Sequence, residues 1–172
     1  DDPYSLTSYT GEEVSTLKSL DQHGNVLYIS SLSKIVASGL RIGWIIGPKP
    51  VIERLSDAKQ QVDFGHASFT QWIANDFLES EFFDSHISSL VKQLENRRNQ
   101  MIASLRHYLQ DQVYFHIPQG GIHLWCRLNE NFNEAQLLEE SIKKGVIYTP
   151  GSTLGSKKGF VRFTFSREKE GT

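Results

Sequence analysis

Two short apolar runs, separated by a segment of small and polar residues, constrain the fold more than any other feature of the sequence. The runs cover residues 26–30 and 42–46 and are rich in β-branched and aromatic residues, which predicts two buried strands. Residues 31–41 form a connection rich in small residues rather than a tight hairpin turn. Polar side chains collected where a buried strand ends are typical of a ligand site in an open α/β sheet. We therefore expect an α/β protein with a site beside the first strand.

Helical sequence follows the second run, and strand-like sequence follows the helices. Apolar periodicity predicts three helices, over about 51–64, 68–79 and 82–109. Beyond them we expect strands over 113–117, 122–128 and 159–166, with a helix over 133–144 that Gly145 closes. The third helix is predicted to bury one apolar stripe: Phe83, Ile87, Leu90, Leu94, Met101, Leu105 and Tyr108. At about 1.5 Å per residue this helix is long enough to link two domains.

Composition excludes several classes of function. The 172 residues are 38% hydrophobic and 22% charged, as in a globular protein. A net charge of −2 with scattered basic pairs gives no general attraction to nucleic acid or to an anionic membrane surface. No apolar run approaches the ~20 residues that cross a bilayer. The single cysteine, Cys126, cannot form an internal disulfide and no signal-peptide pattern opens the chain, so we expect a reducing, cytoplasmic setting.

Lys34 is the candidate catalytic residue. Considered without its neighbours, a lysine between two strands could simply point into water, and this alternative remains open. Its neighbours favour a different interpretation, because Ser31 and Ser33 supply hydroxyl donors and Arg41 supplies a guanidinium within the same connection. Several short donors and one guanidinium suit a phosphate, and an imine-forming amine needs partial shelter from water. The segment is therefore consistent with a phosphate-bearing aldehyde cofactor.

The stretch from Tyr28 to Trp44 contains Ser-x-Ser-Lys followed by Gly-Leu-Arg-x-Gly-Trp. This pattern resembles the Schiff-base segment of the class I/II, fold type I aminotransferases, which use pyridoxal 5′-phosphate (PLP). The resemblance implies that Lys34 forms the internal aldimine and moves the proton between the substrate α-carbon and C4′ of the cofactor. It implies that three further residues hold the phosphate: Ser31, Ser33 and Arg41.

The first four residues, Asp1-Asp2-Pro3-Tyr4, resemble the Asp-x-x-Tyr of the same family. The resemblance implies that Asp1 pairs with the protonated pyridine nitrogen and that the Tyr4 hydroxyl hydrogen-bonds the phenolic oxygen of the ring. A carboxylate at that position keeps the nitrogen protonated, so that the ring accepts electrons. Asp2 is an alternative pairing residue, although the spacing to Tyr4 favours Asp1.

Arg162 lies inside an aromatic strand, Phe160 to Ser166. Burying a guanidinium costs on the order of several kcal/mol unless an anion meets it. The strand therefore predicts a carboxylate partner, with a solvent-exposed edge strand as the alternative. The segment resembles the family's Arg-x-x-Phe-Ser strand, which implies that Arg162 grips the substrate α-carboxylate. Residues 118–125 similarly resemble the Pro-x-Gly-Gly hairpin of the family's small domain.

The resemblance covers nearly the whole chain and implies its architecture. We expect residues 1–110 to be the C-terminal part of the PLP-binding large α/β domain, including the long interdomain helix. Residues 111–172 would form the small C-terminal α+β domain, truncated at its end. Because the chain begins and stops next to strand-like sequence, we expect a fragment of a longer parent. Other parts of the family's PLP site would precede Asp1, so we expect the fragment alone to bind PLP weakly and to turn over little or no substrate.

Two functions from different classes remain open. The first is the aminotransferase-like effector domain of a MocR-type regulator of the GntR family, in which a separate upstream domain binds DNA. The second is a free-standing aminotransferase acting on an amino acid and a 2-oxo acid. Residues 58–63 and 121–125 look more like the regulators. The small-molecule partner is then an amino acid, a 2-oxo acid or an effector, and we expect the parent to be a homodimer with no membrane partner.

The remaining motifs predict no second chemistry. The six histidines show no metal-ligand spacing, so we expect no metal and assign them structural or surface roles. Cys126 lies in an apolar strand and is predicted to be a core residue rather than a nucleophile. Asp63-Phe64-Gly65 would contact magnesium in a kinase, but no other kinase motif accompanies it.

Overall fold

The structure is a computed structural model that describes residues 1–12, 15–129 and 132–166. It divides into two compact units, Asp1–Leu90 and Val91–Thr172, and each is described by itself. The sequence expectation about the C-terminal end of the chain falls on residues 167–172, which lie outside the described ranges. The short 3₁₀ helices are η1 (Ser5–Thr7), η2 (Ser38–Leu40), η3 (Gln110–Gln112) and η4 (Gly151–Leu154).

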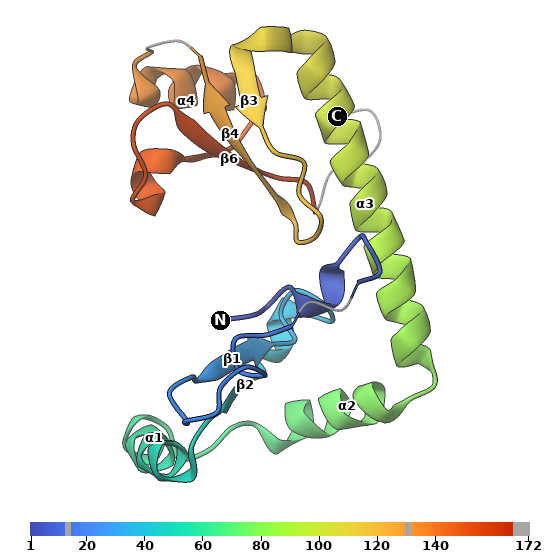
Figure 1. Cartoon of the computed structure of the whole chain (residues 1–172), viewed down its shortest axis with the longest axis vertical. Helices are drawn as coiled ribbons and strands as arrows, with labels where there is room; N and C mark the ends of the chain where they lie inside the picture. The colour runs from blue at the N-terminus through green and yellow to red at the C-terminus, as the bar shows by residue number, and fades with distance from the viewer. Residues whose placement is uncertain (13–14, 130–131, 167–172) are drawn as a thin grey trace. The chain divides into compact units, whose positions relative to one another are not determined.

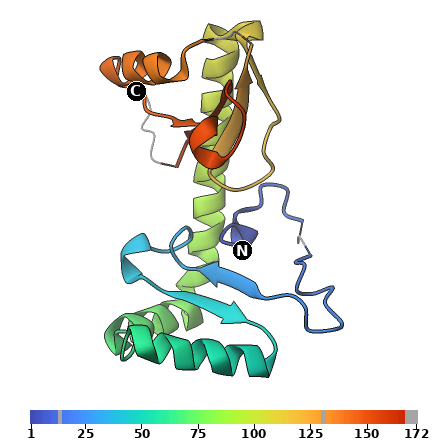
Figure 2. The same cartoon turned by 90° about the vertical axis from the view of Figure 1, so that its left-hand side faces the viewer.

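The first unit contains one pair of antiparallel strands, β1 (Tyr28–Ser31) and β2 (Gly43–Ile46). Helices α1 (Lys49–Val62) and α2 (Ser68–Glu79) lie on the same side of this pair (Figures 1 and 2). Both predicted strands and both predicted helices are present, with β1 beginning two residues later than expected. The predicted burial is wrong for β2, which is exposed along its length, because β1 and β2 form a sheet of only two strands within the described residues. In β1 only Ser30 is buried.

The core of the first unit lies beneath the connection between the two strands. Leu32 is 1% exposed and Ile35 is 6% exposed, and together with Ala74 of α2 they form one buried cluster. Other apolar side chains pack against that cluster: Val36, Leu40, Ile42, Ile87 and Leu90. Because Leu32 and Ile35 lie on either side of Lys34, their burial anchors the backbone that carries this lysine.

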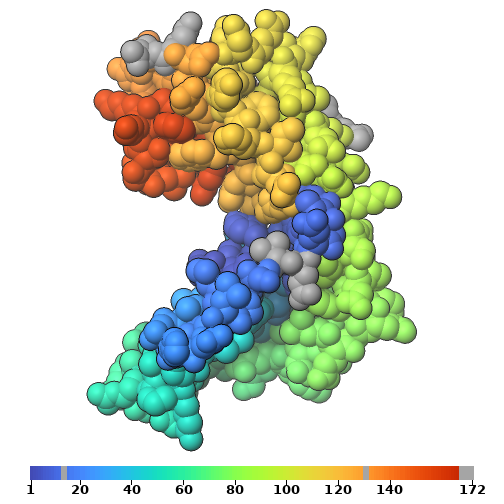
Figure 3. Space-filling model, in the orientation of Figure 1, coloured from blue at the N-terminus to red at the C-terminus, as the bar shows by residue number. Residues whose placement is uncertain are grey.

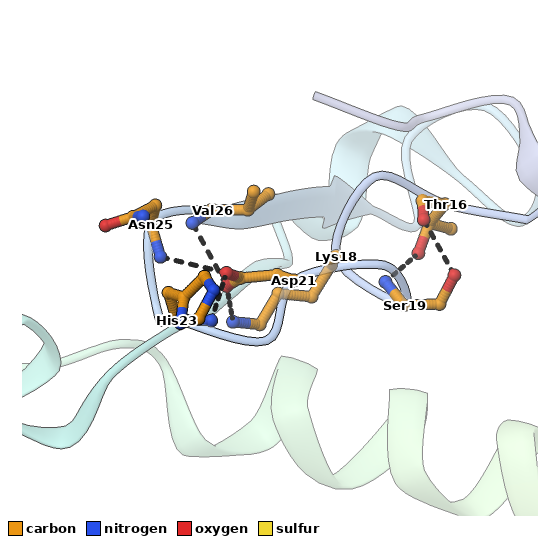
Figure 4. Close-up of polar contacts among 7 residues, drawn as sticks. All are labelled: Thr16, Lys18, Ser19, Asp21, His23, Asn25 and Val26. Atoms are coloured by element: carbon orange, nitrogen blue, oxygen red, sulfur yellow. Dashed lines mark hydrogen bonds and ion pairs between the residues drawn. The ribbon is translucent and has the colours of Figure 1, made fainter.

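The turn before β1 is organised around the carboxylate of Asp21 (Figure 4). Asp21 accepts hydrogen bonds from Lys18 Nζ at 2.8 Å and from the backbone N–H groups of His23, Asn25 and Val26 at 3.2, 3.0 and 3.1 Å. Its side chain is only 3% exposed. The bond from Lys18, together with the backbone donors, holds the pKa of this carboxyl well below its usual range. One acidic side chain therefore fixes the path by which the chain enters β1.

Helix α3 (Phe82–Tyr108) begins in the first unit and ends in the second. Its buried positions Leu94, Arg98 and Ile102 follow one another at steps of four residues. The predicted apolar stripe is correct at Leu94 but wrong at Tyr108, which is 77% exposed. Tyr108 comes six residues after Ile102, or about 240° further around the helix, and so lies on the opposite face.

The second unit is built on a four-stranded antiparallel sheet with the order β3-β4-β6-β5. The strands are β3 (Val113–Phe115), β4 (His123–Leu128), β5 (Thr149–Pro150) and β6 (Phe160–Thr164). Helix α4 (Glu134–Lys143) follows an N-cap at Asn133, whose side chain accepts from the backbone N–H of Gln136. Figure 3 shows the orange and red residues of this unit packed as one continuous body. Strand β5 was not predicted, because two residues carry no detectable alternation.

The two faces of this sheet differ in burial. Leu124, Cys126 and Val161 are at most 1% exposed and form the core side. Burial raises the pKa of the Cys126 thiol to about 12, as expected for a core cysteine. Trp125 and Arg162, one residue before Cys126 and one after Val161, point to the other face because side chains alternate along a strand.

The division of the chain into two compact units falls between Leu90 and Val91, inside α3. A division within one continuous helix does not decide where the domain boundary falls, so the boundary between residues 110 and 111 stays a prediction. Across the described ranges, no helix combines the length and the apolar character needed to cross a membrane.

Candidate functional site

Lys34 lies in a closed turn directly after β1. The backbone N–H groups of Ile35 and Val36 both donate to the carbonyl oxygen of Leu32, at 3.3 and 2.9 Å. At the base of the connection, the Leu32 N–H donates to the carbonyl of Ile42 at 3.1 Å. The backbone that carries Lys34 is therefore held by its own hydrogen bonds and by the buried side chains on both sides.

The side chain of Lys34 is exposed, whereas Leu32 and Ile35 are buried. The turn sends these two apolar side chains into the core and Lys34 away from it. The expected partial shelter of the Lys34 amine from water is not provided by the described residues.

The predicted phosphate donors share the connection with Lys34. Ser31 ends β1, and its hydroxyl oxygen accepts a long hydrogen bond, 3.4 Å, from the Ser33 N–H. Arg41 adopts a left-handed backbone conformation with φ of 55°, and its Nη1 donates to the carbonyl of Ser38 at 2.9 Å. The connection carries two cationic side chains and no carboxylate. The Ser31 hydroxyl keeps its own proton and Arg41 has further N–H groups, so this donor set fits a phosphate.

The first four residues lie beside β1 in the same unit. The Asp2 N–H donates to the carbonyl of Ile29 at 2.7 Å, and the Ser30 hydroxyl donates to the carbonyl of Asp2 at 2.8 Å. The carbonyl of Tyr4 accepts from the backbone N–H and the hydroxyl of Thr7, at 2.9 and 2.8 Å. The structure thus brings the segment with the predicted ring-binding residues, Asp1 and Tyr4, next to the strand that leads to Lys34.

Two histidines donate to backbone carbonyls of the connection. His86 Nε2 donates to the carbonyl of Ile35 at 2.7 Å, and His66 Nε2 donates to the carbonyl of Arg41 at 2.6 Å. Sequence reasoning did not find these contacts. The histidines lie 51 and 25 residues from their acceptors, and a side-chain bond to a distant carbonyl leaves no local spacing pattern.

Arg162 occupies the centre of the second unit's exposed sheet face. It lies opposite Trp125 of β4 and Thr149 of β5, so β6 is an interior strand and the edge-strand alternative is wrong. Arg162 Nη2 donates a long hydrogen bond, 3.4 Å, to the Thr149 hydroxyl. Its Nε is buried without a partner among the described residues. An unmet buried donor costs about 1–3 kcal/mol, which an anionic acceptor would recover.

The predicted hairpin after α3 is present as the β3–β4 pair, with Phe115 opposite Cys126. The carbonyl of Pro118, in the loop that joins the strands, accepts from Nη1 of Arg98 at 2.8 Å. Arg98 is only 9% exposed and also pairs with Glu95 at 3.0 Å. A buried arginine of α3 therefore fixes the loop of this hairpin.

Among the described residues, no group of three or more histidine, cysteine, aspartate or glutamate side chains is placed to hold a metal ion. Asp63 of the Asp-Phe-Gly motif instead pairs with Lys59 and accepts from the backbone N–H of Gly65 at 3.1 Å.

The chain is similar to aminotransferases and to HTH-type regulators over most of its length. The family model described as "Aminotransferase class I and II" matches residues 1–171. The chain is 37% identical over 151 residues to the "Uncharacterized HTH-type transcriptional regulator YdfD" of Bacillus subtilis, a match covering 87% of this chain and 31% of the relative. It is 38% identical over 151 residues to "Aromatic-amino-acid aminotransferase 1" of Thermococcus litoralis, covering 88% of this chain and 36% of the relative.

The fold is also shared with solved structures. The kynurenine aminotransferase of Pyrococcus horikoshii, solved in complex with "PMP, KYN as substrates and KYA as products", superposes with a TM-score of 0.91 at 32% identity. That match covers 98% of this chain and 42% of the solved chain. The predicted architecture, the C-terminal part of an α/β aminotransferase fold, is confirmed. The chain spans about a third of the length of the curated relatives it matches.

Proposed function

The chain belongs to the aminotransferase class I and II family, and from this premise we propose that Lys34 attaches PLP within the aminotransferase-like effector domain of a transcriptional regulator. PLP is the cofactor of this family. The observation that carries the proposal is the connection after β1, in which the Lys34 amine, the hydroxyls of Ser31 and Ser33 and the Arg41 guanidinium lie on one segment without any carboxylate.

The predicted site residues of the first unit would divide the binding of the cofactor among them. When bound, PLP supplies an aldehyde that condenses with amines and a ring that accepts electrons. The Lys34 amine holds the cofactor and acts as the base that moves the proton. Asp1 keeps the ring nitrogen protonated and Tyr4 donates to the phenolic oxygen. The phosphate is bound by three residues: Ser31, Ser33 and Arg41.

Arg162 is proposed to bind the carboxylate of the substrate or effector. The support is its buried, unpartnered Nε together with the planar donor geometry of a guanidinium, which matches a carboxylate. Because carboxylate binding does not require catalysis, this role is the same in a regulator and in an enzyme.

The regulator is the favoured form of the parent protein. Its support is the similarity to an HTH-type regulator over 87% of the chain, together with the regulator-like residues 58–63 and 121–125. DNA would then be bound by a separate domain, and an amino acid or related effector would be sensed here. The second candidate is a free-standing aminotransferase, which the similar identity to an aromatic-amino-acid aminotransferase favours.

The proposal is tested by titrating PLP into the full-length protein and following the visible absorbance of the bound cofactor. We expect a saturable band in the wild type and its loss in Lys34→Ala. The control is Lys49→Ala, a lysine of α1 whose side chain is 85% exposed. An unchanged band in a folded Lys34→Ala protein would contradict the proposal.

The full-length protein can also be used to distinguish the regulator from the free-standing aminotransferase. A regulator should bind its own promoter DNA with an affinity that changes on addition of PLP and amino acid, and should transfer amino groups slowly. Rapid amino-group transfer without any DNA binding would establish the free-standing enzyme instead.

A further inference from the structure

Two histidines outside the connection, His86 and His66, donate hydrogen bonds to its backbone carbonyl groups. Ile35, which accepts the bond from His86, directly follows Lys34 in the sequence. Arg41, which accepts the bond from His66, is itself the predicted phosphate-binding guanidinium. One histidine therefore contacts the backbone next to the proposed attachment lysine, and the other contacts the backbone of the proposed phosphate ligand.

The contact from His86 is reinforced by its packing. The His86 ring meets the Phe77 ring edge-on, with centroids 5.4 Å apart and an interplanar angle of 79°. Phe77 belongs to α2 and His86 belongs to α3. The next residue of α3, Ile87, packs against the core cluster that contains Leu32 and Ile35. The imidazole is thus a fixed donor rather than a freely rotating one.

The hydrogen bond from His66 is made to Arg41, whose backbone conformation is unfavourable. Arg41 has a positive φ of 55°, a conformation that is unfavourable for a residue with a side chain unless its surroundings impose it. The bond from His66 to the Arg41 carbonyl stabilises this conformation, as does the bond from the Arg41 side chain to Ser38. The direction in which the guanidinium leaves the backbone depends on that conformation.

We propose that His86 and His66 are positioning residues that fix the backbone on which Lys34 and Arg41 are presented to the cofactor. The inference rests on the proposed function, because it assigns the two histidines to the PLP site. Neither histidine is a catalytic residue in this account. Both act through main-chain carbonyl groups of the connection.

The first test measures hydrogen exchange in the full-length protein without added PLP. We compare wild type with His86→Leu, which replaces the imidazole by an apolar side chain without a donor, and with His86→Gln, which keeps an N–H donor. His66→Leu and His66→Gln form a second pair. His107→Leu is the matched control, because His107 is an exposed histidine of α3 whose ring contacts Tyr108.

The reporters are the amides inside the connection, Val36 and Leu40, which donate to Leu32 and Ala37. We expect exchange over residues 32–41 to rise about fivefold or more in the leucine variants, since one hydrogen bond is lost. The glutamine variants and His107→Leu should stay near wild type. Unchanged exchange in the leucine variants, or an equal rise over β4 in the second unit, would overturn the proposal.

The second test measures PLP affinity of the same variants from the visible absorbance. The leucine variants should bind PLP about threefold to tenfold more weakly at a temperature where all remain folded, and glutamine should restore the affinity. A purely structural role would lower the melting temperature but leave PLP affinity unchanged, which would refute the positioning role. If the wild type itself shows no Lys34-dependent band, the proposed function fails, and the exchange experiment still decides whether the histidines hold the connection.

Discussion

Arg162 has a buried guanidinium N–H group that a bound ligand could satisfy. It lies on β6, which pairs with β4 on one side and β5 on the other. Its Nε is buried and meets no acceptor among the described residues, and its Nη2 reaches only a distant hydroxyl. A carboxylate would satisfy this donor and neutralise the charge together.

Substituting Arg162 should therefore separate binding from stability. In the full-length protein, we expect Arg162→Leu to weaken binding of a carboxylate ligand roughly tenfold to a hundredfold, and Arg162→Lys to weaken it less. The melting temperature without ligand should not fall, because an unsatisfied donor is removed. Titration calorimetry and thermal unfolding measure the two quantities. Arg127→Leu, which removes a cation over the Tyr114 ring on the same sheet, is the control, and an equal effect there would count against a specific role.

The thiol of Cys126 should be unreactive in the folded protein. It is fully buried, and its pKa is raised to about 12 by desolvation, so almost no thiolate forms near neutral pH. We expect a thiol reagent at pH 8 to modify Cys126 more than about a hundredfold more slowly in the native protein than after denaturation. Fast stoichiometric labelling of the folded protein would show that this strand is not core.

At the scale of elements, the position of β1 depends on the turn before it. The Asp21 carboxylate gathers three backbone N–H groups and one ammonium. Its pKa is lowered in the folded state chiefly by the bond from Lys18. A carboxyl with a lowered pKa stabilises the fold fully above its unfolded pKa, and this contribution is lost as the pH falls through the folded value.

Asp21→Asn should lower the melting temperature of the full-length protein by several degrees at pH 7, because the amide cannot pair with Lys18 and brings its own donors to the turn. The difference from wild type should shrink as the pH falls below about 4, because Asp21 is then protonated in the unfolded chain while the folded carboxylate, whose pKa is lowered, still carries its charge. Thermal unfolding across pH 3 to 7 measures this. Asp57→Asn on the exposed surface of α1 is the control, and a pH-independent difference would contradict the linkage.

Local patterns predicted most elements of this chain but few of its long-range contacts. Helices α1, α2, α3 and α4 lie within about two residues of their predicted bounds, because apolar spacing and Gly145 are local signals. The placement of Ser31, Ser33, Lys34 and Arg41 on one connection was likewise readable from the sequence. The exposure of β2 and of Lys34 was not, since burial depends on what packs against a segment. The bonds from His66 and His86 were missed for the same reason.

At the scale of the whole molecule, the described residues include the proposed phosphate donors but leave the Lys34 amine exposed. The chain covers about a third of the length of its curated relatives. We therefore expect the 172-residue chain to bind PLP at least about tenfold more weakly than the full-length protein. Absorbance titrations of both proteins measure this, and equal affinities would show that residues 1–172 contain a complete cofactor site. The homodimer expected for the parent stays a prediction.

The Lys34 amine is the proposed point of cofactor attachment. The most direct measurement is borohydride reduction of the full-length protein after incubation with PLP, followed by proteolysis and mass spectrometry of the labelled peptide. We expect one phosphopyridoxyl group on the peptide that contains Lys34. A label at another lysine, or no label on a folded protein saturated with PLP, would contradict it.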